Sequence, residues 1–385
     1  GMSNITEVLD DGAGEPPVHM LSDYVQIIFL AVALSIGLPS NILVLSKLLT
    51  LYKPSRKDSV KAGFLLLKLN LAVSDIMLLA FFAAPRIVWL ITYEWKGTDF
   101  MCKAHNYLSM ASFYLSSNII VCIALDRLRT VLGASKIRRG RNAARYIRIL
   151  LFLSWFFAFV WASPQWVFFK TVTIEFTEMD WSQCTDVWQI RKVKPDEPVP
   201  APDWLLTPTV QMFYEILHLI LVFWGPLVVL LVSYAIIAMR LARISFQAPS
   251  SVRLLPHLPV DPPTTSVVRS GDQDDPPLLV SIDKEATTQS STAVFSALWK
   301  KKSPKANGVS AMQPLWRRRL RGKLFRSTLL IVAAHFIFWF PYNFSSLIAY
   351  LCAECQEYLQ MHANVLNDLQ LMIVLVNPFL YAFTQ

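Results

Sequence analysis

Among the charged side chains inside or at the ends of long apolar runs, three have the clearest chemical potential in the chain. Asp75 falls within the apolar run 62–92, and Asp126 and Arg127 come near the end of the run 102–129. A charge at the centre of a bilayer costs roughly 2.5 to 3.5 kcal/mol on insertion scales, so intramembrane charges are usually functional. We expect Asp75 to lie among polar partners, and Asp126 and Arg127 to mark a membrane boundary.

The sequence does not indicate enzyme chemistry. It contains neither a His-Glu-x-x-His zinc motif nor a phosphate-binding glycine loop. His218 and His335 are lone histidines inside apolar runs, where packing is the commoner role, and 363–385 offers no lysine that could bind retinal. We predict a protein that is not an enzyme and binds no cofactor.

Composition indicates a membrane protein with several spans. Of the 385 residues, 54% are hydrophobic and only 16% are charged, which is too apolar for an ordinary soluble chain. The net charge of +9 does not indicate a nucleic-acid partner, because 27 of the 36 Lys and Arg residues fall in 51–61, 127–148 and 240–326. Under the positive-inside rule these segments are cytoplasmic. The first 23 residues carry acids but no Lys or Arg, so we expect the N-terminus outside.

Seven apolar runs are long enough to cross a bilayer, which takes about 20 residues. The predicted spans are 24–50, 62–92, 102–129, 146–169, 208–240, 324–351 and 363–384. The predicted fold is therefore an all-α bundle of seven transmembrane helices over 24–385, with the tail 1–23 outside and the C-terminus inside.

The segment 241–320 is predicted to be a disordered cytoplasmic loop, because it is rich in Pro, Ser and Thr. Basic clusters close this loop, and they either bind anionic membrane lipid or act simply as stop-transfer charges.

Asp75 needs polar partners if it is buried. Asn41, Ser116 and Asn377 can supply them if the first, second, third and seventh helices pack together. The alternative is that Asp75 only forms a structural hydrogen bond between helices and has no role in switching.

Prolines and a basic boundary residue suggest moving helices. Each proline in a span removes a backbone hydrogen bond and kinks its helix. They occur in four successive spans: Pro164, Pro226, Pro341 and Pro378. Arg127 lies where a cytoplasmic partner can reach it, with Tyr234 and Tyr381 at matching depth on other spans. The alternative for Arg127 is an arginine that snorkels to the headgroups.

Two cysteines are placed to pair on the oxidising side. Cys102 begins the third span and Cys184 lies in the loop after the fourth, so a disulfide would tether that loop. Cys352 and Cys355 either form a local disulfide or stay free. Asn4 begins an N-glycosylation signal in the tail.

These residues together resemble the rhodopsin-like family of G protein-coupled receptors over nearly the whole chain. The family's marker residues occur in order: Asn41, Leu71 to Asp75, Asp126-Arg127, Trp155, Pro226, Tyr234, Trp339-x-Pro341 and Asn377-Pro378-x-x-Tyr381. Within the family the chain is most similar to gonadotropin-releasing hormone and adipokinetic hormone receptors, as a divergent invertebrate member. That similarity rests on four short motifs: Cys102-Lys103-x-x-x-Tyr107-Leu108, Ser163-Pro164-Gln165, Ser182-Gln183-Cys184 and Phe213-Tyr214.

The resemblance implies a receptor at the plasma membrane that binds an extracellular peptide hormone and activates a heterotrimeric G protein, of the Gq class. The ligand would favour a conformer in which the sixth helix swings outward and opens a crevice at Arg127. The pocket residues expected from the resemblance are Arg86, Ser109, Gln165, Tyr214, Glu215, Trp339, Tyr342 and Asn343. Arg86 and Glu215 would provide opposite charges near the mouth, unless Arg86 snorkels to the outer headgroups.

Several departures from the family pattern bear on ligand and ion binding. Arg86 stands where the hormone receptors have an acid and Ser109 where they have a lysine, so we expect a hormone with different charged groups. The resemblance implies a sodium site at Asp75, but Ile373 and Val374 replace its usual polar pair, so no metal is expected. The sequence ends at Gln385, before the family's amphipathic helix and tail, and we expect these to be absent either by nature or by truncation.

Two alternatives remain at this stage. One is another neuropeptide receptor of the same fold, for example a vasopressin-like receptor. The other is a seven-helix transporter or channel, which Asp126-Arg127 with Tyr234 and Tyr381 at the cytoplasmic ends argues against.

Overall fold

The computed structural model describes residues 19–382 except for 56–58, 133–142, 176–179, 195–197, 200, 247–314 and 353–364. Contacts divide the chain into one unit of residues 1–237 and 313–385 and a second unit of residues 238–312. The following concerns the first unit. Asn4 and Cys355 lie outside the described residues.

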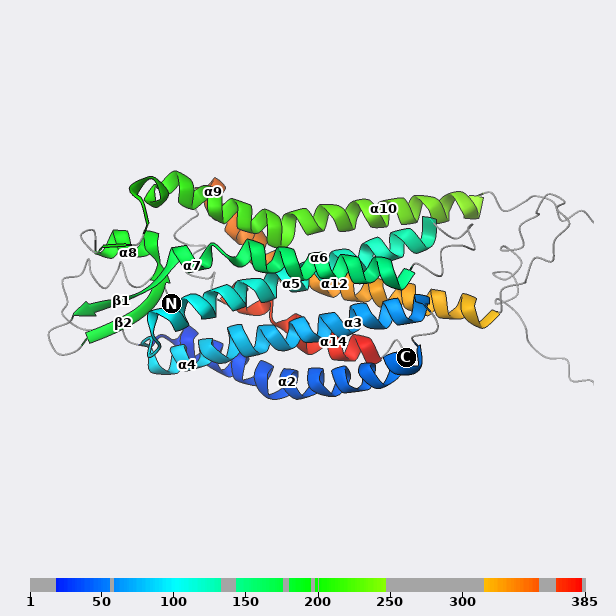
Figure 1. The fold of residues 1–385 in the computed structure, drawn as a ribbon, viewed down its shortest axis with the longest axis horizontal. Coiled ribbons are helices and arrows are strands. Elements are labelled where there is room, and N and C mark those ends of the chain that lie inside the picture. Colours follow the sequence, from blue (N-terminus) through cyan, green and yellow to red (C-terminus); the bar gives the residue numbers. More distant parts are fainter. Residues whose placement is uncertain are drawn as a thin grey trace, which may run out of the picture. The chain divides into compact units, whose positions relative to one another are not determined.

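Six helices of the described residues are long and apolar enough to cross a membrane. They run over Leu21–Ser55, Val60–Thr92, Asp99–Leu132, Ala144–Phe168, Pro208–Arg240 and Leu329–Ala349, and Val365–Leu380 is a shorter apolar helix. Figure 1 shows α2 (Leu21–Ser55), α3 (Ser59–Met77), α5 (Asp99–Leu132) and α6 (Ala143–Ala162) lying side by side along their length. The predicted spans agree with these helices to within a few residues, and the fifth agrees at both ends.

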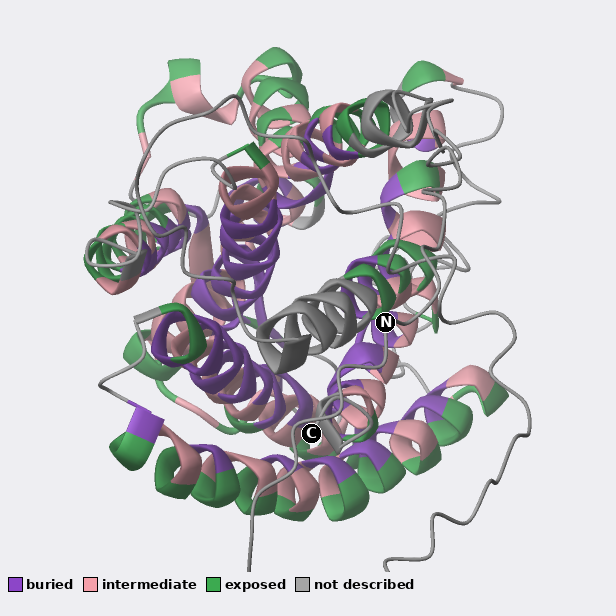
Figure 2. Cartoon of the chain, turned by 90° about the vertical axis from the view of Figure 1, so that its right-hand side faces the viewer, coloured by how far each residue is buried: buried purple, intermediate pink, exposed green. Residues whose placement is uncertain are grey.

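The third span, α5, lies at the centre of the bundle. It packs against α3, α6 and α12 (Leu315–Leu351), and it carries buried residues all along its length. Figure 2 shows that the buried faces of the helices point toward one another and the exposed faces point outward. Many outward side chains are large and apolar, among them Leu43, Phe152 and Leu231. Apolar outer faces are what a helix bundle surrounded by lipid requires.

Two spans contain a π-helical turn just before a proline. The turn η1 (Leu78–Ala83) precedes Pro85 at the start of α4 (Ala84–Thr92), and η4 (Ile220–Trp224) precedes Pro226 near the start of α10 (Gly225–Phe246). A proline removes a helical hydrogen bond, and the wider turn takes up the change. Gly225 is required here, because an added Cβ would lie 2.8 Å from the carbonyl oxygen of Ile220.

The helical bundle also carries a two-stranded hairpin, which the sequence did not lead us to predict. After the fourth span and the short helix α7 (Gln165–Phe168), strands β1 (Phe169–Glu175) and β2 (Asp180–Asp186) pair in antiparallel fashion, with Thr171 opposite Cys184. The run Thr171-Val-Thr-Ile174 is rich in β-branched residues, a strand signal that the sequence analysis passed over. The hairpin is followed by the short helices α8 (Val187–Val193) and η3 (Asp203–Leu206), and then by α9 (Pro208–Leu219).

The seventh span is interrupted, whereas the sequence predicted one continuous helix over 363–384. Gln370 and Leu371 form a turn before α14 (Met372–Ala382). The amide of Leu371 bonds the carbonyl of Asp368 at 2.9 Å, and that of Val374 bonds the carbonyl of Leu371 at 3.0 Å. These hydrogen bonds join residues that are three apart in the chain instead of four, so the backbone is locally wound more tightly than an α-helix.

The two ends of the segment 241–320, predicted to be a disordered loop, are helical. Helix α10 continues to Phe246 and α12 begins at Leu315, while 247–314 lie outside the described residues. Apolar periodicity alone does not find these extensions, because they lie beyond the apolar spans.

Candidate functional site

A cavity of about 220 Å³ lies between the helices near the hairpin. Mostly aromatic and polar side chains enclose it, and they come from η1, α4 and the loop after it, α5, the hairpin, α9, η4, α12 and the seventh span. Its lining residues are Phe82, Arg86, Trp89, Trp95, His105, Asn106, Ser109, Met110, Phe113, Phe169, Cys184, His218, Val222, Tyr342, Asn367 and Gln370.

Arg86 is the cationic residue of this cavity wall. Its Nε lies 3.3 Å from Oδ1 of Asp368, and its Nη2 donates a hydrogen bond of 2.9 Å to Oε1 of Gln26. The Arg86 side chain is 11% exposed and that of Asp368 is 3% exposed. Arg86 therefore turns into the bundle and joins the second and seventh spans, instead of snorkelling to headgroups. The sequence analysis missed Asp368.

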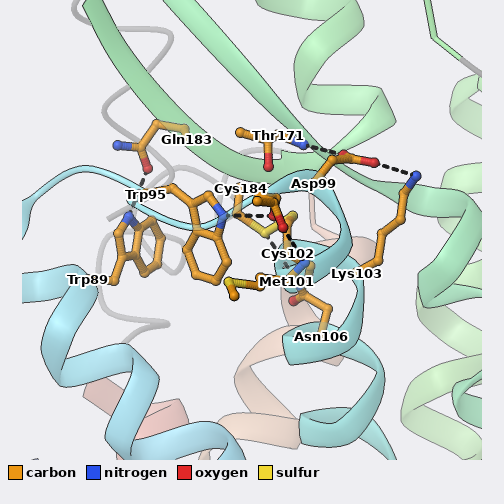
Figure 3. The surroundings of a disulfide bond; sticks show 11 residues. Trp89, Trp95, Asp99, Met101, Cys102, Lys103, Asn106, Thr171, Gln183 and Cys184 are labelled. Carbon is orange, nitrogen blue, oxygen red and sulfur yellow. Dashed lines mark hydrogen bonds and ion pairs between the residues drawn. A yellow bond between two sulfur atoms is a disulfide. The ribbon is translucent and has the colours of Figure 1, made fainter.

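The hairpin forms one wall of the cavity because a disulfide joins it to α5. Cys102 and Cys184 are bonded, with their Cα atoms 5.5 Å apart, and Nδ2 of Asn106 lies 3.2 Å from the sulfur of Cys184. The carboxylate of Asp99 accepts a hydrogen bond of 2.9 Å from the amide of Thr171 in β1. Figure 3 shows these contacts around the sulfur atoms. Covalent and polar contacts thus hold both strands against the start of α5.

The loop after α4 is fixed to the same hairpin. Nε1 of Trp89 donates to Oε1 of Gln183 at 2.9 Å (Figure 3). Tyr93 ends α4 in the left-handed region with φ 55°, and its carbonyl accepts bonds from Trp181 and Gln183 at 2.7 and 3.0 Å. A left-handed tyrosine is costly, so the two bonds from the hairpin help to maintain it.

Asp186, at the end of β2, caps the following helix. Its Oδ1 accepts a hydrogen bond of 2.9 Å from the amide of Gln189 in the first turn of α8. Burial raises the pKa of Asp186 above its ordinary value, although the Gln189 bond and the charge of Lys192 act in the opposite direction.

Of the eight pocket residues expected from the sequence, three line the cavity: Arg86, Ser109 and Tyr342. The hydroxyl of Ser109 donates to the carbonyl of Phe81 at 2.8 Å. The fully buried Trp339 lies edge-on to Phe113, a lining residue, with ring centroids 5.7 Å apart.

The other expected pocket residues lie off the cavity wall. Gln165 donates a hydrogen bond to the Tyr214 hydroxyl, and Glu215 accepts one of 2.9 Å from Gln211. Asn343 is fully buried and donates to the Trp339 carbonyl at 2.8 Å.

The sequence analysis missed most of the cavity wall. One signal was available on α5, where Asn106, Met110 and Phe113 lie three or four residues from Ser109 or from one another, and so share a helix face. Extending the expected face of Ser109 by this spacing would have found all three. The contributions of Trp95 and Phe169 depend on the loop and the hairpin, which apolar periodicity does not place.

Asp75 is fully buried at the middle of the bundle. Both of its carboxylate oxygens accept from Nδ2 of Asn377, at 3.2 and 2.9 Å. Asn41 instead donates to the carbonyls of Gly37 and Val374, at 2.9 and 2.8 Å. Ser116 is also fully buried, but its hydroxyl has no hydrogen-bond partner among the described residues. The structure thus brings Asp75 directly to one of its three expected partners.

Arg127 is enclosed at the end of the bundle opposite the hairpin. Its Nη2 donates to Oδ2 of Asp126 at 2.7 Å, and its guanidinium carbon lies 4.9 Å from the ring centroid of Phe64. Only 5% of Arg127 is exposed, so a partner cannot reach it in this conformation.

The remaining expected switch residues lie on three helices. Tyr234 is half-buried on α10, Pro341 lies inside α12, and Pro378 lies inside α14. The backbone of Tyr381 belongs to α14, and its side chain lies outside the described residues.

Comparison with known proteins gives a match over most of the chain. A family model described as "7 transmembrane receptor (rhodopsin family)" matches residues 40–381. A protein named G-protein coupled receptor daf-38, from Caenorhabditis elegans, is 29% identical over 99% of this chain and 94% of its own length.

Two further relatives match shorter stretches of the chain. A gonadotropin-releasing hormone receptor from Octopus vulgaris is 30% identical over 46% of this chain and 39% of its own length. The human vasopressin V1b receptor is 30% identical over 34% of this chain and 31% of its own length.

Proposed function

The chain belongs to the rhodopsin family of seven-transmembrane receptors, and from that premise we propose that it is a peptide-hormone receptor similar to the gonadotropin-releasing hormone receptors. In this proposal it passes the binding of an extracellular peptide to a heterotrimeric G protein of the Gq class. Membership of the family makes the protein a multi-pass signalling receptor of the plasma membrane and not an enzyme. It also leaves the transporter or channel alternative without support.

The observation that carries the proposal is the cavity beneath the disulfide-tethered hairpin. The disulfide joins the hairpin to the start of α5, whereas Arg127 lies near the end of that helix. Disulfides persist in oxidising surroundings, so the hairpin end would face outside. The basic segments 127–148 and 240–326 would then lie inside, as the positive-inside rule requires.

The cavity fits one end of a peptide. Its volume of about 220 Å³ is below the roughly 300 to 1,000 Å³ of most small-molecule pockets. A peptide would insert a few side chains and lay the remainder against the hairpin. Arg86 faces the cavity while its partner Asp368 is not part of the wall, so the inserted end would offer acceptor groups, such as amide carbonyls or a carboxylate.

A vasopressin-like ligand is the second candidate, and the V1b receptor match supports it. The two candidates differ only in ligand, so one peptide panel separates them.

Calcium release in cells that express the full chain with a promiscuous Gα subunit would test the proposal. The panel contains gonadotropin-releasing hormone-type, adipokinetic-type and vasopressin-type peptides, and Arg127→Ala at matched surface expression is the control. We expect a saturable response to one peptide class that Arg127→Ala abolishes.

Arg86→Met tests the cavity separately. It should shift the dose–response curve to higher peptide concentration without lowering surface expression to the same degree. Silence toward every peptide despite proven surface expression would contradict the proposed ligand class.

A further inference from the structure

Two buried cations share one aromatic ring at the end of the bundle opposite the hairpin. The ammonium nitrogen of Lys68 lies 4.6 Å from the ring centroid of Phe64, and the guanidinium carbon of Arg127 lies 4.9 Å from the same centroid. Phe64 and Lys68 are one helical turn apart on α3, and Arg127 comes from the neighbouring α5. Their shared ring fixes the two charges close together.

Both cations are enclosed. Lys68 is 3% exposed and Arg127 is 5% exposed, so neither charge reaches lipid headgroups in this conformation. Lys68 lies eight residues inside the span that begins at Val60, which is about 12 Å along a helix. Because both charges lie over one ring, they are near enough to repel each other, and the repulsion is stronger where water is excluded.

We propose that Lys68 is a positioning residue that repels Arg127. This repulsion destabilises the conformer in which Arg127 is enclosed between Asp126 and Phe64. The cost of moving Arg127 out of this place is then lower than in a chain with a neutral residue at position 68. The consequence for signalling rests on the proposed function, in which an exposed Arg127 meets the G protein. Lys68 would raise the population of that exposed conformer in the absence of ligand.

A packing role is the alternative for Lys68. Its stem would fill space beside Phe64, and its ammonium would gain a cation–π contact whether or not Arg127 is charged. The two roles differ in whether the effect of Lys68 depends on Arg127. If Lys68 repels Arg127, neutralising Lys68 helps more when Arg127 is present. If Lys68 only packs, the effect of neutralisation is the same in both backgrounds.

A double-mutant cycle on thermal unfolding separates these roles without a ligand or G protein. The full chain, Lys68→Met, Arg127→Met and the double variant are purified in lipid nanodiscs and melted at one scan rate. We expect the Lys68→Met shift in Tm to be more positive by about 2 °C or more with Arg127 than with Met at position 127. Equal shifts, or a smaller shift in the presence of Arg127, would overturn the proposal, as would failure of Lys68→Met alone to fold.

Lys68→Arg provides the matched control. It keeps the positive charge, so its Tm shift should lack the gain of Lys68→Met. In cells, basal signalling should fall several-fold in Lys68→Met and stay near the original level in Lys68→Arg.

The two proposals can fail separately. Coupling in the melting cycle, together with a receptor that never activates a Gα subunit, would remove the proposed function but keep the repulsion. A receptor that signals through Arg127 but shows no coupling would keep the function and remove the role of Lys68.

Discussion

Arg86 and Arg127 lie at opposite ends of the bundle in similar local surroundings. Each is beside an aspartate, with Asp368 at 3.3 Å and Asp126 at 2.7 Å. Each also lies over a phenylalanine ring, at 5.7 Å from the centroid for Arg86 and 4.9 Å for Arg127. The difference is where the aspartate comes from. Asp368 belongs to another span, whereas Asp126 is the neighbouring residue in the chain.

This difference determines what each ion pair can hold. The pair of Arg86 joins two helices and faces a cavity, so a ligand that engages Arg86 also acts on the contact between those helices. The pair of Arg127 is local to α5, so it keeps the arginine in place without joining helices. The hairpin end is therefore held by long-range contacts, and the opposite end is closed by contacts that one side-chain movement can release.

The largest effect on stability is expected from removing the disulfide, which acts at the hairpin end of the bundle only. The bond closes a loop with a sequence separation of 82 residues. Chain-entropy estimates give about 4 to 5 kcal/mol for such a loop, as an upper limit because inserted helices already restrict the unfolded chain. We expect Cys102→Ser with Cys184→Ser to lower Tm and to abolish peptide binding, measured by thermal unfolding and by radioligand binding at the cell surface.

The control for the disulfide test is Cys122→Ala, which removes the buried free thiol. This variant should remain as sensitive to reductant as the original chain. The double serine variant should lose only the part of that sensitivity that comes from the Cys102–Cys184 bond, because Cys352 is also disulfide-bonded. A double serine variant that melts at the original temperature would show that hairpin contacts such as Asp99 with Thr171 suffice to hold that end.

A smaller effect is expected from breaking each ion pair in turn. Asp368→Ala should cost about 3 kcal/mol, the lower end for a buried pair that loses one partner, since Arg86 faces a cavity that water can enter. Asp126→Ala should cost less, about 1 kcal/mol, because Arg127 lies five residues before the end of α5 and can turn outward. Thermal unfolding of both variants in the same nanodiscs measures the difference.

Charge exchange provides the matched control for Asp368. The double variant Arg86→Asp with Asp368→Arg should recover part of the stability that Asp368→Ala loses, since it restores an ion pair between the same helices. Equal losses for Asp368→Ala and Asp126→Ala would contradict the contrast between a long-range and a local pair.

The helices were predictable from the sequence because the bilayer imposes a length and a composition on each span. The fifth span was predicted at both ends, where Pro208 begins α9 and Arg240 stops the apolar run. The contact of Asp75 with Asn377 was also predictable, since a buried carboxylate needs a donor and few polar residues lie at its depth.

The cavity wall was not predictable in the same way, because it depends on contacts between distant segments. Asp368 lies near the turn that interrupts the seventh span, and nothing in the local sequence indicates that it meets Arg86. Lys68 reads as one basic residue in an apolar run, and only the packing of α3 against α5 brings it to the ring that Arg127 contacts. A periodic pattern gives the face of a helix but not its neighbour.

The smallest effect is expected at Asp186. This residue adds a pH-dependent group to the hairpin end, which distinguishes that end further from the end at Arg127. Burial raises its pKa in the folded state, despite the Gln189 bond and the Lys192 charge. The folded chain thus holds this proton more tightly than the unfolded chain does. The contribution of Asp186 to stability is complete below the unfolded pKa, and it is lost as pH rises through the folded pKa.

Asp186→Asn should keep the cap on α8 and remove this pH dependence, so at neutral pH it should be as stable as the original chain or slightly more stable. Asp186→Ala removes the cap itself and should cost about 1 kcal/mol at every pH. Thermal unfolding of the three chains between pH 4 and pH 8 measures both effects. This range begins near the ordinary Asp pKa of about 3.9 and extends upward from it. If the Asn variant is less stable than the original chain at neutral pH, the charged carboxylate stabilises the hairpin. The Gln189 bond and the Lys192 charge together would then outweigh the cost of burying the charge.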